Sequence, residues 1–231
     1  GPARATPAHP VFEASERELR PLPFYDRAQA LGAGRCDWHS ERPEMRLLVT
    51  LTGAECARCA AEGLDLADVL RHAVEGVTGR VTRLDFALDV YTPGADPMDL
   101  KRAWDAGQVR TPARTCGDVG MTGPGGVDLG RAVYLGSRTS ERVRRVYDKA
   151  RLEGFEGVWV RVELECKGDY AHALARSMLA RGVIPAGKTA LRQFVAADVP
   201  WFREALSGES GPVELVENKN TDRRRWYPAQ L

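Results

Sequence analysis

Three short segments in which polar and apolar residues alternate constrain the fold of this chain most strongly. They are residues 81–90 (VTRLDFALDV), 142–149 (RVRRVYDK) and 158–166 (VWVRVELEC). Successive side chains of a β-strand point to opposite faces. Each segment is therefore predicted to be a strand that presents acidic or nucleophilic side chains on one face and apolar side chains on the other. Three such strands side by side would gather the polar groups on one face of a sheet.

Six side chains are expected to share that polar face: Asp85, Asp89, Tyr147, Lys149, Glu163 and Glu165. Carboxylates are costly to gather in this way unless they hold a cation, and two or three of them suit Mg²⁺ or Mn²⁺. A tyrosine beside such an ion is a candidate nucleophile on phosphorus, and Lys149 would help the phenol to ionise or steady the phosphate. In the alternative reading, the two aspartates pair with arginines on a half-exposed sheet, and Tyr147 packs in the core or at the rim. Tyr134 competes for the role of nucleophile.

The arginines suggest a phosphate-rich partner, although the net charge of the chain is only +1. Arginine binds phosphate with two parallel hydrogen bonds, and nucleic acid needs only a local positive face. In the alternative, these arginines form solvated surfaces balanced by acids. The predicted DNA contacts are Arg138, Arg142, Arg144, Arg145, Arg161, Arg223, Arg224 and Arg225.

Other catalytic chemistries find little support in the sequence. The four histidines are isolated from one another, without an H-x-H or H-E-x-x-H pattern, which argues against zinc hydrolysis. Cys56 and Cys59 form a lone C-x-x-C, which we interpret as two small residues on a helix. The odd number of cysteines argues against a secreted disulfide framework and indicates a reducing cytoplasm.

The remaining patterns predict an α+β fold, a mainly antiparallel sheet with helices packed on one face. Other predicted strands and helices, with an irregular arm and a mobile glycine-rich loop, fill the rest of the chain. They are a hairpin of 35–39 with 45–51, helices at 66–77, 170–181 and 188–206, a hairpin of 131–138 with 142–149, the arm at 3–23 and the loop at 117–130.

The length suits one catalytic domain over residues 3–231 with a core at about 45–180. We interpret Gly1-Pro2 as the remnant of a cleaved expression tag, so that the sequence is expected to be a piece of a longer protein. Apolar runs fall short of the roughly 18 residues that a membrane span needs, and no membrane association is expected.

The order of the three polar motifs resembles the Rep_trans family of replication initiators. The resemblance rests on RLDFALD (83–89), YLGSRTSERVRRVYDK (134–149) and WVRVELE (159–165), and covers about residues 45–180. The family comprises rolling-circle plasmid initiators and related relaxases of conjugative elements. The resemblance implies an HUH/RRM-like nicking endonuclease core in which carboxylates replace the histidine pair.

The resemblance also implies a function and partners. Tyr147, in the R-x-Y-x-K motif, would attack DNA and become linked to the 5′-phosphate, and the acidic motifs would supply Asp85, Asp89, Glu163 and Glu165. The expected activity is metal-dependent nicking and rejoining at an origin. The expected partners are single-stranded, hairpin or supercoiled DNA and a host helicase, and a homodimer is an alternative to a monomer. A relaxase with the same chemistry and a non-catalytic DNA-binding regulator are the competing hypotheses.

Overall fold

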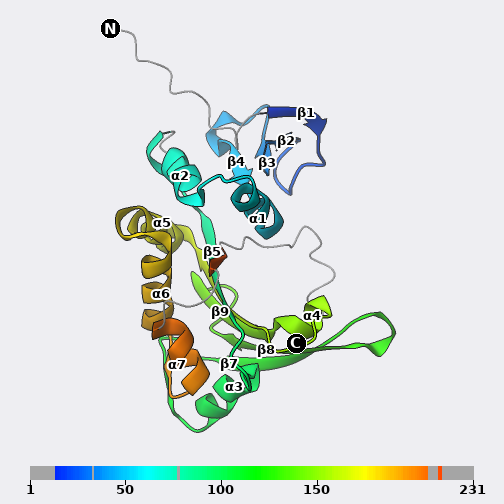
Figure 1. Ribbon diagram of the computed structural model, residues 1–231. Coiled ribbons are helices and arrows are strands. Elements are labelled where there is room, and N and C mark those ends of the chain that lie inside the picture. The colour runs from blue at the N-terminus through cyan, green and yellow to red at the C-terminus, as the bar shows by residue number, and fades with distance from the viewer. Residues whose placement is uncertain (1–13, 33, 77–78, 208–212, 215–231) are drawn as a thin grey trace. The chain divides into compact units, whose positions relative to one another are not determined.

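The computed structural model describes residues 14–32, 34–76, 79–207 and 213–214 (Figure 1). The chain divides into two compact units: Gly1–Gly79 with Leu215–Leu231, and Arg80–Glu214. Each unit has its own sheet, and every strand pairing between described residues is antiparallel. The expectation that residues 3–231 form one domain stays a prediction.

The first unit combines a four-stranded sheet with short helices. The strands follow the order β1-β2-β3-β4, and the buried side chains of Cys59 and Val69 form a small core with neighbouring leucines. Its elements are β1 (Ala14–Glu18), β2 (Arg27–Leu31), β3 (Arg35–Trp38), the 3₁₀ turn η2 (Pro43–Met45), β4 (Leu48–Thr50), α1 (Gly53–Ala61), α2 (Leu66–Arg71) and the π-helical turn η3 (His72–Gly76). Asp65 caps α2 by accepting a hydrogen bond from the Ala67 amide, 2.8 Å away.

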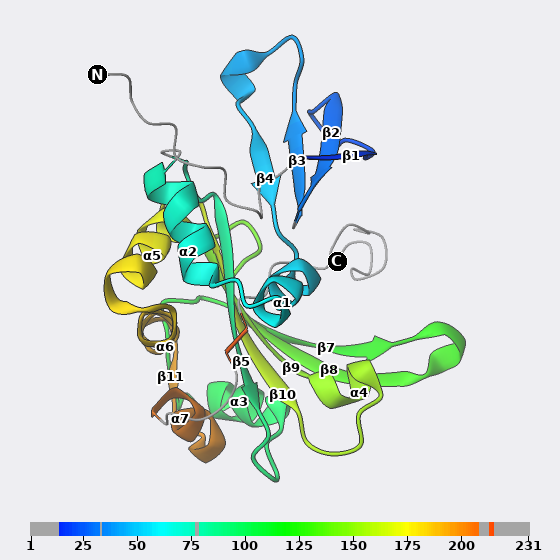
Figure 2. The same ribbon diagram turned by 45° about the horizontal axis from the view of Figure 1, so that its top comes forward.

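The second unit is built on a six-stranded sheet with the strand order β12-β5-β10-β9-β8-β7 (Figure 2). The strands are β5 (Arg83–Val90), β7 (Cys116–Thr122), β8 (Asp128–Leu135), β9 (Arg142–Asp148), β10 (Val160–Lys167) and β12 (Val213–Glu214), with a separate pair formed by β6 (Val109–Arg110) and β11 (Ala196–Ala197). The helices are α3 (Pro97–Asp105), the 3₁₀ turn η4 (Pro124–Gly126), α4 (Lys149–Glu153), α5 (Gly168–Arg181), α6 (Val183–Phe194) and α7 (Pro200–Ser207).

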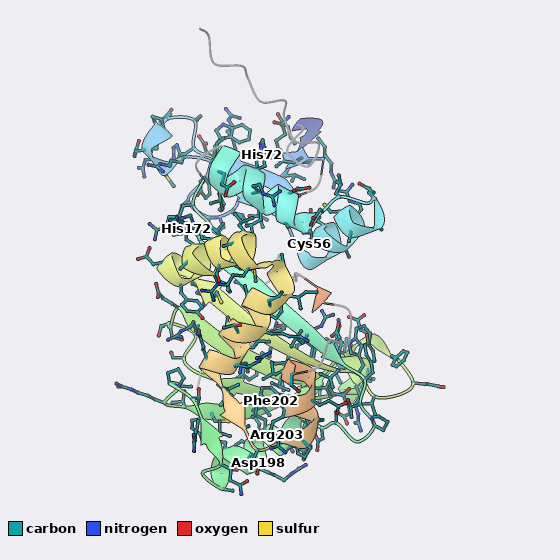
Figure 3. The ribbon with its side chains drawn as sticks, turned by 60° about the vertical axis from the view of Figure 1, so that its left-hand side comes forward. Cys56, His72, His172, Asp198, Phe202 and Arg203 are labelled. Carbon is teal, nitrogen blue, oxygen red and sulfur yellow. The ribbon has the colours of Figure 1, made fainter. Side chains whose placement is uncertain are left out.

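The apolar face of this sheet forms the core beneath the helices. Phe86, Val146 and Leu164 are fully buried there. Gly187 of α6 lies so close to Phe86 that an added Cβ would stand 2.2 Å from the ring. Phe202 of α7 is also buried, whereas Asp198 and Arg203 pair at the surface, 3.3 Å apart (Figure 3). The other face of the sheet is therefore the one left for chemistry.

The predicted fold class is confirmed, with several corrections to its elements. The glycine-rich segment 117–130 is not a loop, because most of it belongs to the β7–β8 hairpin. The helix predicted at 188–206 is two helices, α6 and α7, separated by β11. The predicted arm contains β1, and the strand predicted at 45–51 is shortened to β4. Within the described part of the chain, no helix is long and apolar enough to cross a membrane.

Candidate active site

The register of three central strands gathers polar side chains on one face of the second sheet. β10 lies between β5 and β9, with Glu165 opposite Asp85 and Arg161 opposite both Asp89 and Tyr147. Glu163 lies opposite Arg145 of β9. The alternation read from the sequence therefore brings the four carboxylates and the tyrosine to a common face.

Tyr147 is held by a direct hydrogen bond to a carboxylate. Its hydroxyl donates to Glu163 Oε1 at 2.7 Å, and the side chain is only 7% exposed. Arg145 Nε donates to the other oxygen of Glu163 at 2.8 Å, and its guanidinium lies 5.1 Å from the centre of the Tyr147 ring. Burial and the negative charge of Glu163 raise the pKa of Tyr147 well above its usual range, against the opposing effect of Arg145. The phenol is therefore protonated at rest.

A second group of charges lies where β5 and β10 pair. Arg83 bridges the two strands, donating to Asp85 Oδ2 and to Glu165 Oε2, each at 2.7 Å. Lys167 reaches the other Glu165 oxygen at 2.7 Å. Burial, aided by the nearby charges of Glu165 and Glu163, raises the pKa of Asp85 to about 6 despite Arg83. Burial acts in the same direction on Glu165, but Lys167 and Arg83 outweigh it and hold the pKa of Glu165 below its usual value.

Asp89 is held by its own set of hydrogen-bond donors. It is four residues beyond Asp85 on the same strand, a separation of roughly 13 Å, and both of its oxygens are engaged. Arg161 donates to them at 2.7 and 2.6 Å, and Trp159 Nε1 donates at 2.7 Å. Asp89 and Arg161 are 8% and 4% exposed. The structure thus favours a buried ion pair over the predicted cation ligand at Asp89 and phosphate contact at Arg161.

Lys149 begins a helix and does not continue the strand. β9 ends at Asp148, whose side chain caps α4 by accepting from the Arg151 amide at 3.0 Å. The Lys149 ammonium pairs with Glu153 and lies 5.5 Å from the centre of the Trp159 ring. The hydroxyl of Tyr147 is bonded to Glu163 and not to Lys149, and a catalytic role for Lys149 stays a prediction.

Of the four carboxylates predicted to bind a divalent cation, three remain candidates: Asp85, Glu163 and Glu165. Among the residues that the structure describes, no group of three or more His, Cys, Asp or Glu is arranged to hold a metal ion. Arginine and lysine side chains occupy oxygens of Asp85, Glu163 and Glu165. The donor chemistry nevertheless fits a hard cation, because Glu165 lies opposite Asp85 and Glu163 lies two residues away along β10 on the same face. Binding would require the basic side chains to move aside.

The arginines around Tyr147 separate into two sets. Arg142 and Arg144 face the helices, with Arg142 lying 4.7 Å from the centre of the Tyr170 ring. Arg144 is fully buried and donates to the Leu191 carbonyl at 3.1 Å, so the predicted phosphate contact is wrong for this side chain. Arg138 is exposed at the β8–β9 turn, and Arg145 lies on the tyrosine face. The predicted contacts Arg223, Arg224 and Arg225 lie outside the described residues.

Two side chains that organise this face, Arg83 and Lys167, had no assigned role in the sequence-based hypothesis. Trp159 was expected only as a residue that could stack on unpaired bases, and its bond to Asp89 was not predicted. The signal for the first two was present, since each lies two residues from a candidate carboxylate and so on the same strand face. The bond from Trp159 to Asp89 depends on pairing across strands, which the spacing along one strand does not reveal.

Two of three comparisons with known proteins give matches, and the third gives none. The family model Rep_trans, described as a replication initiation factor, matches residues 79–198, just over half of the chain. A solved structure of a rolling circle replication initiator protein from Geobacillus stearothermophilus matches with a TM-score of 0.67 and 18% sequence identity. The alignment covers 93% of this chain and 78% of that one. The comparison with curated proteins gave no match. The structural likeness establishes a shared fold.

Proposed function

Because the chain belongs to the Rep_trans family of replication initiation factors, we propose that it starts rolling-circle replication by nicking one DNA strand at an origin. Tyr147 is the proposed nucleophile, and the product is a 5′-phosphotyrosine with a free 3′-hydroxyl. That hydroxyl can prime a polymerase, and reversal of the attack rejoins the strand.

One observation carries this proposal: the hydroxyl of Tyr147 donates to Glu163 at 2.7 Å within a face of gathered carboxylates. A buried tyrosine hydroxyl usually finds a hydrogen-bond partner, and here the partner is a carboxylate, which can accept its proton. The arrangement pairs a nucleophile with a base, and Arg145 in turn orients that base. All three residues fall within the segment that matches the family model.

The proposed step conserves atoms and charge. The Tyr147 oxygen forms a bond to phosphorus as its proton passes to Glu163 Oε1, and the bond from phosphorus to the 3′-oxygen breaks. The leaving 3′-oxygen takes up a proton from solvent water to become the free 3′-hydroxyl, and Glu163 keeps the proton of the phenol until it is lost to solvent. At rest the raised pKa of Tyr147 disfavours this proton transfer. Positive charge brought near the phenol would oppose the effects of burial and of Glu163 and so favour its ionisation.

Asp85, Glu163 and Glu165 would hold a divalent cation, Mg²⁺ or Mn²⁺, whose chemistry is to neutralise charge on the phosphate in the transition state. Arg83 and Lys167, which now cover these oxygens, would turn toward the negatively charged DNA. Arg138 and Arg145 are the described arginines best placed to hold flanking phosphates. A host helicase is the further partner that strand displacement would require.

The test uses labelled single-stranded DNA libraries with Mn²⁺ and denaturing gels that reveal covalent protein–DNA adducts. We expect an adduct with the unmodified protein, none after addition of EDTA, and none with Tyr147→Phe, which should still bind DNA. Tyr134→Phe is the matched control, because Tyr134 lies opposite Arg145 on the neighbouring strand β8. An adduct that survives Tyr147→Phe but disappears with Tyr134→Phe would overturn the assignment of the nucleophile.

The same assay separates the competing functions. A DNA-binding regulator would bind these libraries without forming an adduct under any metal condition. A relaxase would form the same adduct, so it is distinguished by the site that it cuts, an origin of transfer instead of an origin of replication.

A further inference from the structure

Three aromatic side chains form a cluster beside the proposed nucleophile, and the chemistry described above does not use it. Trp159 is at its centre, with Tyr91 stacked on it at 5.9 Å and an interplanar angle of 29°. Phe155 meets Trp159 edge-on at 6.0 Å and 87°. Tyr91 and Phe155 are 47% and 51% exposed, so large aromatic surfaces face solvent.

A hydrogen bond and two cation–ring contacts fix Trp159, at the centre of the cluster, to its neighbours. The Trp159 indole nitrogen donates to Asp89 at 2.7 Å, and Asp89 is itself held by Arg161. The guanidinium of Arg161 lies 5.7 Å from the centre of the Trp159 ring, with the Lys149 ammonium 5.5 Å away. These contacts hold the indole of Trp159 in place. Tyr91 and Phe155 therefore pack against a ring that is already ordered, which lowers the entropy cost of binding a ligand.

The strand register places this cluster next to Tyr147. Trp159 immediately precedes β10, two residues before Arg161, and Arg161 lies opposite Tyr147. Two residues along a strand span about 7 Å and return to the same face. A DNA strand with its phosphate at Tyr147 would therefore bring a neighbouring base within reach of the cluster.

We propose that Tyr91 and Phe155 bind an unpaired base of single-stranded DNA next to the phosphate that Tyr147 attacks, with Trp159 as their support. The inference deepens the proposed function and rests on it. Exposed aromatic rings stack on any base because every base has a π-face, so the contact would favour an unpaired strand over a duplex without reading its sequence.

The charges around the cluster favour a base over a phosphate as the occupant. Glu156 is next to Phe155 and is exposed, which disfavours an approaching phosphate. The nearest ammonium, that of Lys149, is buried and paired with Glu153. A flat group with apolar faces suits exposed rings bordered by acids, and an unpaired nucleobase is such a group.

The test measures binding of a fluorescein-labelled oligothymidine to the full chain carrying Tyr147→Phe, so that cleavage does not disturb the equilibrium. Tyr91→Ala and Phe155→Ala are each expected to weaken binding about 5-fold to 150-fold, the range for loss of one stacked base. Tyr91→Phe keeps the ring and should bind normally. The dependence of affinity on salt should not change, because no phosphate contact is removed.

A second readout reports stacking directly. A 2-aminopurine placed in the oligothymidine should lose fluorescence on binding, and Tyr91→Ala with Phe155→Ala should restore it. Ile184→Ala on α6 is the matched control, since Ile184 is 46% exposed and apolar. Unchanged affinity and unchanged quenching in both alanine variants would overturn the proposal, as would an equal loss of duplex binding.

Failure of the base-stacking proposal and failure of the proposed function give different results. If only the base-stacking proposal is wrong, Tyr91→Ala in the otherwise unmodified protein still forms the Tyr147 adduct and binds oligothymidine normally. If Tyr147 is not the nucleophile, the adduct survives Tyr147→Phe whatever the stacking assays show.

Discussion

Replacing Asp89 by asparagine tests whether this carboxylate is a structural partner of Arg161 or a cation ligand. The substitution keeps the shape of the side chain and removes the charge that compensates a guanidinium only 4% exposed. Two hydrogen bonds of 2.7 and 2.6 Å join the pair. Removing one partner of a buried ion pair costs about 3–5 kcal/mol, because the other charge stays buried. For a chain of this size the midpoint of thermal unfolding should fall by about 6–20 °C.

The measurement is urea and thermal unfolding of the ion-free protein, with Asp128→Asn as the matched control. Asp128 also pairs with an arginine, Arg151, but the two side chains are 64% and 57% exposed. That exposed pair should contribute no more than about 1 kcal/mol. The double variant Asp89→Leu, Arg161→Met should recover much of the loss, because it removes both charges together.

The reasoning is refuted if Asp89→Asn unfolds like the unmodified protein yet binds Mn²⁺ more weakly. That result would make Asp89 a cation ligand, as the sequence alone suggested, and would return it to the group formed by Asp85, Glu163 and Glu165.

Three further predictions follow from single contacts. The pKa of Asp85 is about 6 in the folded state against 3.8 in the reference state, so the folded state holds the proton more tightly. As pH rises through this window the ion-free protein should lose stability while its affinity for Mn²⁺ increases, and Asp85→Asn should flatten both trends in unfolding and titration experiments. Gly187→Ala should destabilise the protein by about 1–3 kcal/mol in urea unfolding because its Cβ would stand 2.2 Å from Phe86; Gly120→Ala, with open space around it, is the control. Arg138→Met should reduce the slope of log affinity for DNA against log salt concentration by about 0.7–0.9. Arg144→Met should leave this slope unchanged because Arg144 is buried. Equal slopes for the two variants would contradict the assignment of Arg138 to the DNA-facing set and of Arg144 to the set that faces the helices.

The sequence predicted the polar face well because period-2 alternation is a local property. The strand β10 runs Arg161, Glu163, Glu165 and Lys167 along one face, and nothing beyond the chain order is needed to see it. The same alternation places Arg142 and Arg144 on the face opposite Tyr147. The sequence-based hypothesis listed them with Arg145 as DNA contacts because they are close in sequence, although the alternation places them on the other face.

Other features depend on pairings that local patterns do not encode. A carboxylate such as Asp89 suits a cation and a guanidinium equally, and only the register with Arg161 decides between them. Six glycines made residues 117–130 resemble a loop, although ladder pairing between β7 and β8 orders most of them as strand. Helix α3 was not predicted, although Asp96 followed by Pro97 is a typical start of a helix. In the structure the Asp96 side chain accepts a hydrogen bond from the Met98 amide at 2.9 Å.

Mass spectrometry of the protein–DNA adduct tests the central claim most directly. After incubation with single-stranded DNA and Mn²⁺, the adduct is digested with protease and nuclease, and the peptide that carries the residual nucleotide is sequenced. The account predicts a nucleotide joined through its 5′-phosphate to Tyr147 and a strand released with a free 3′-hydroxyl. A nucleotide on Tyr134 or on any other side chain, or a cut strand with no covalent peptide under any metal condition, would contradict it.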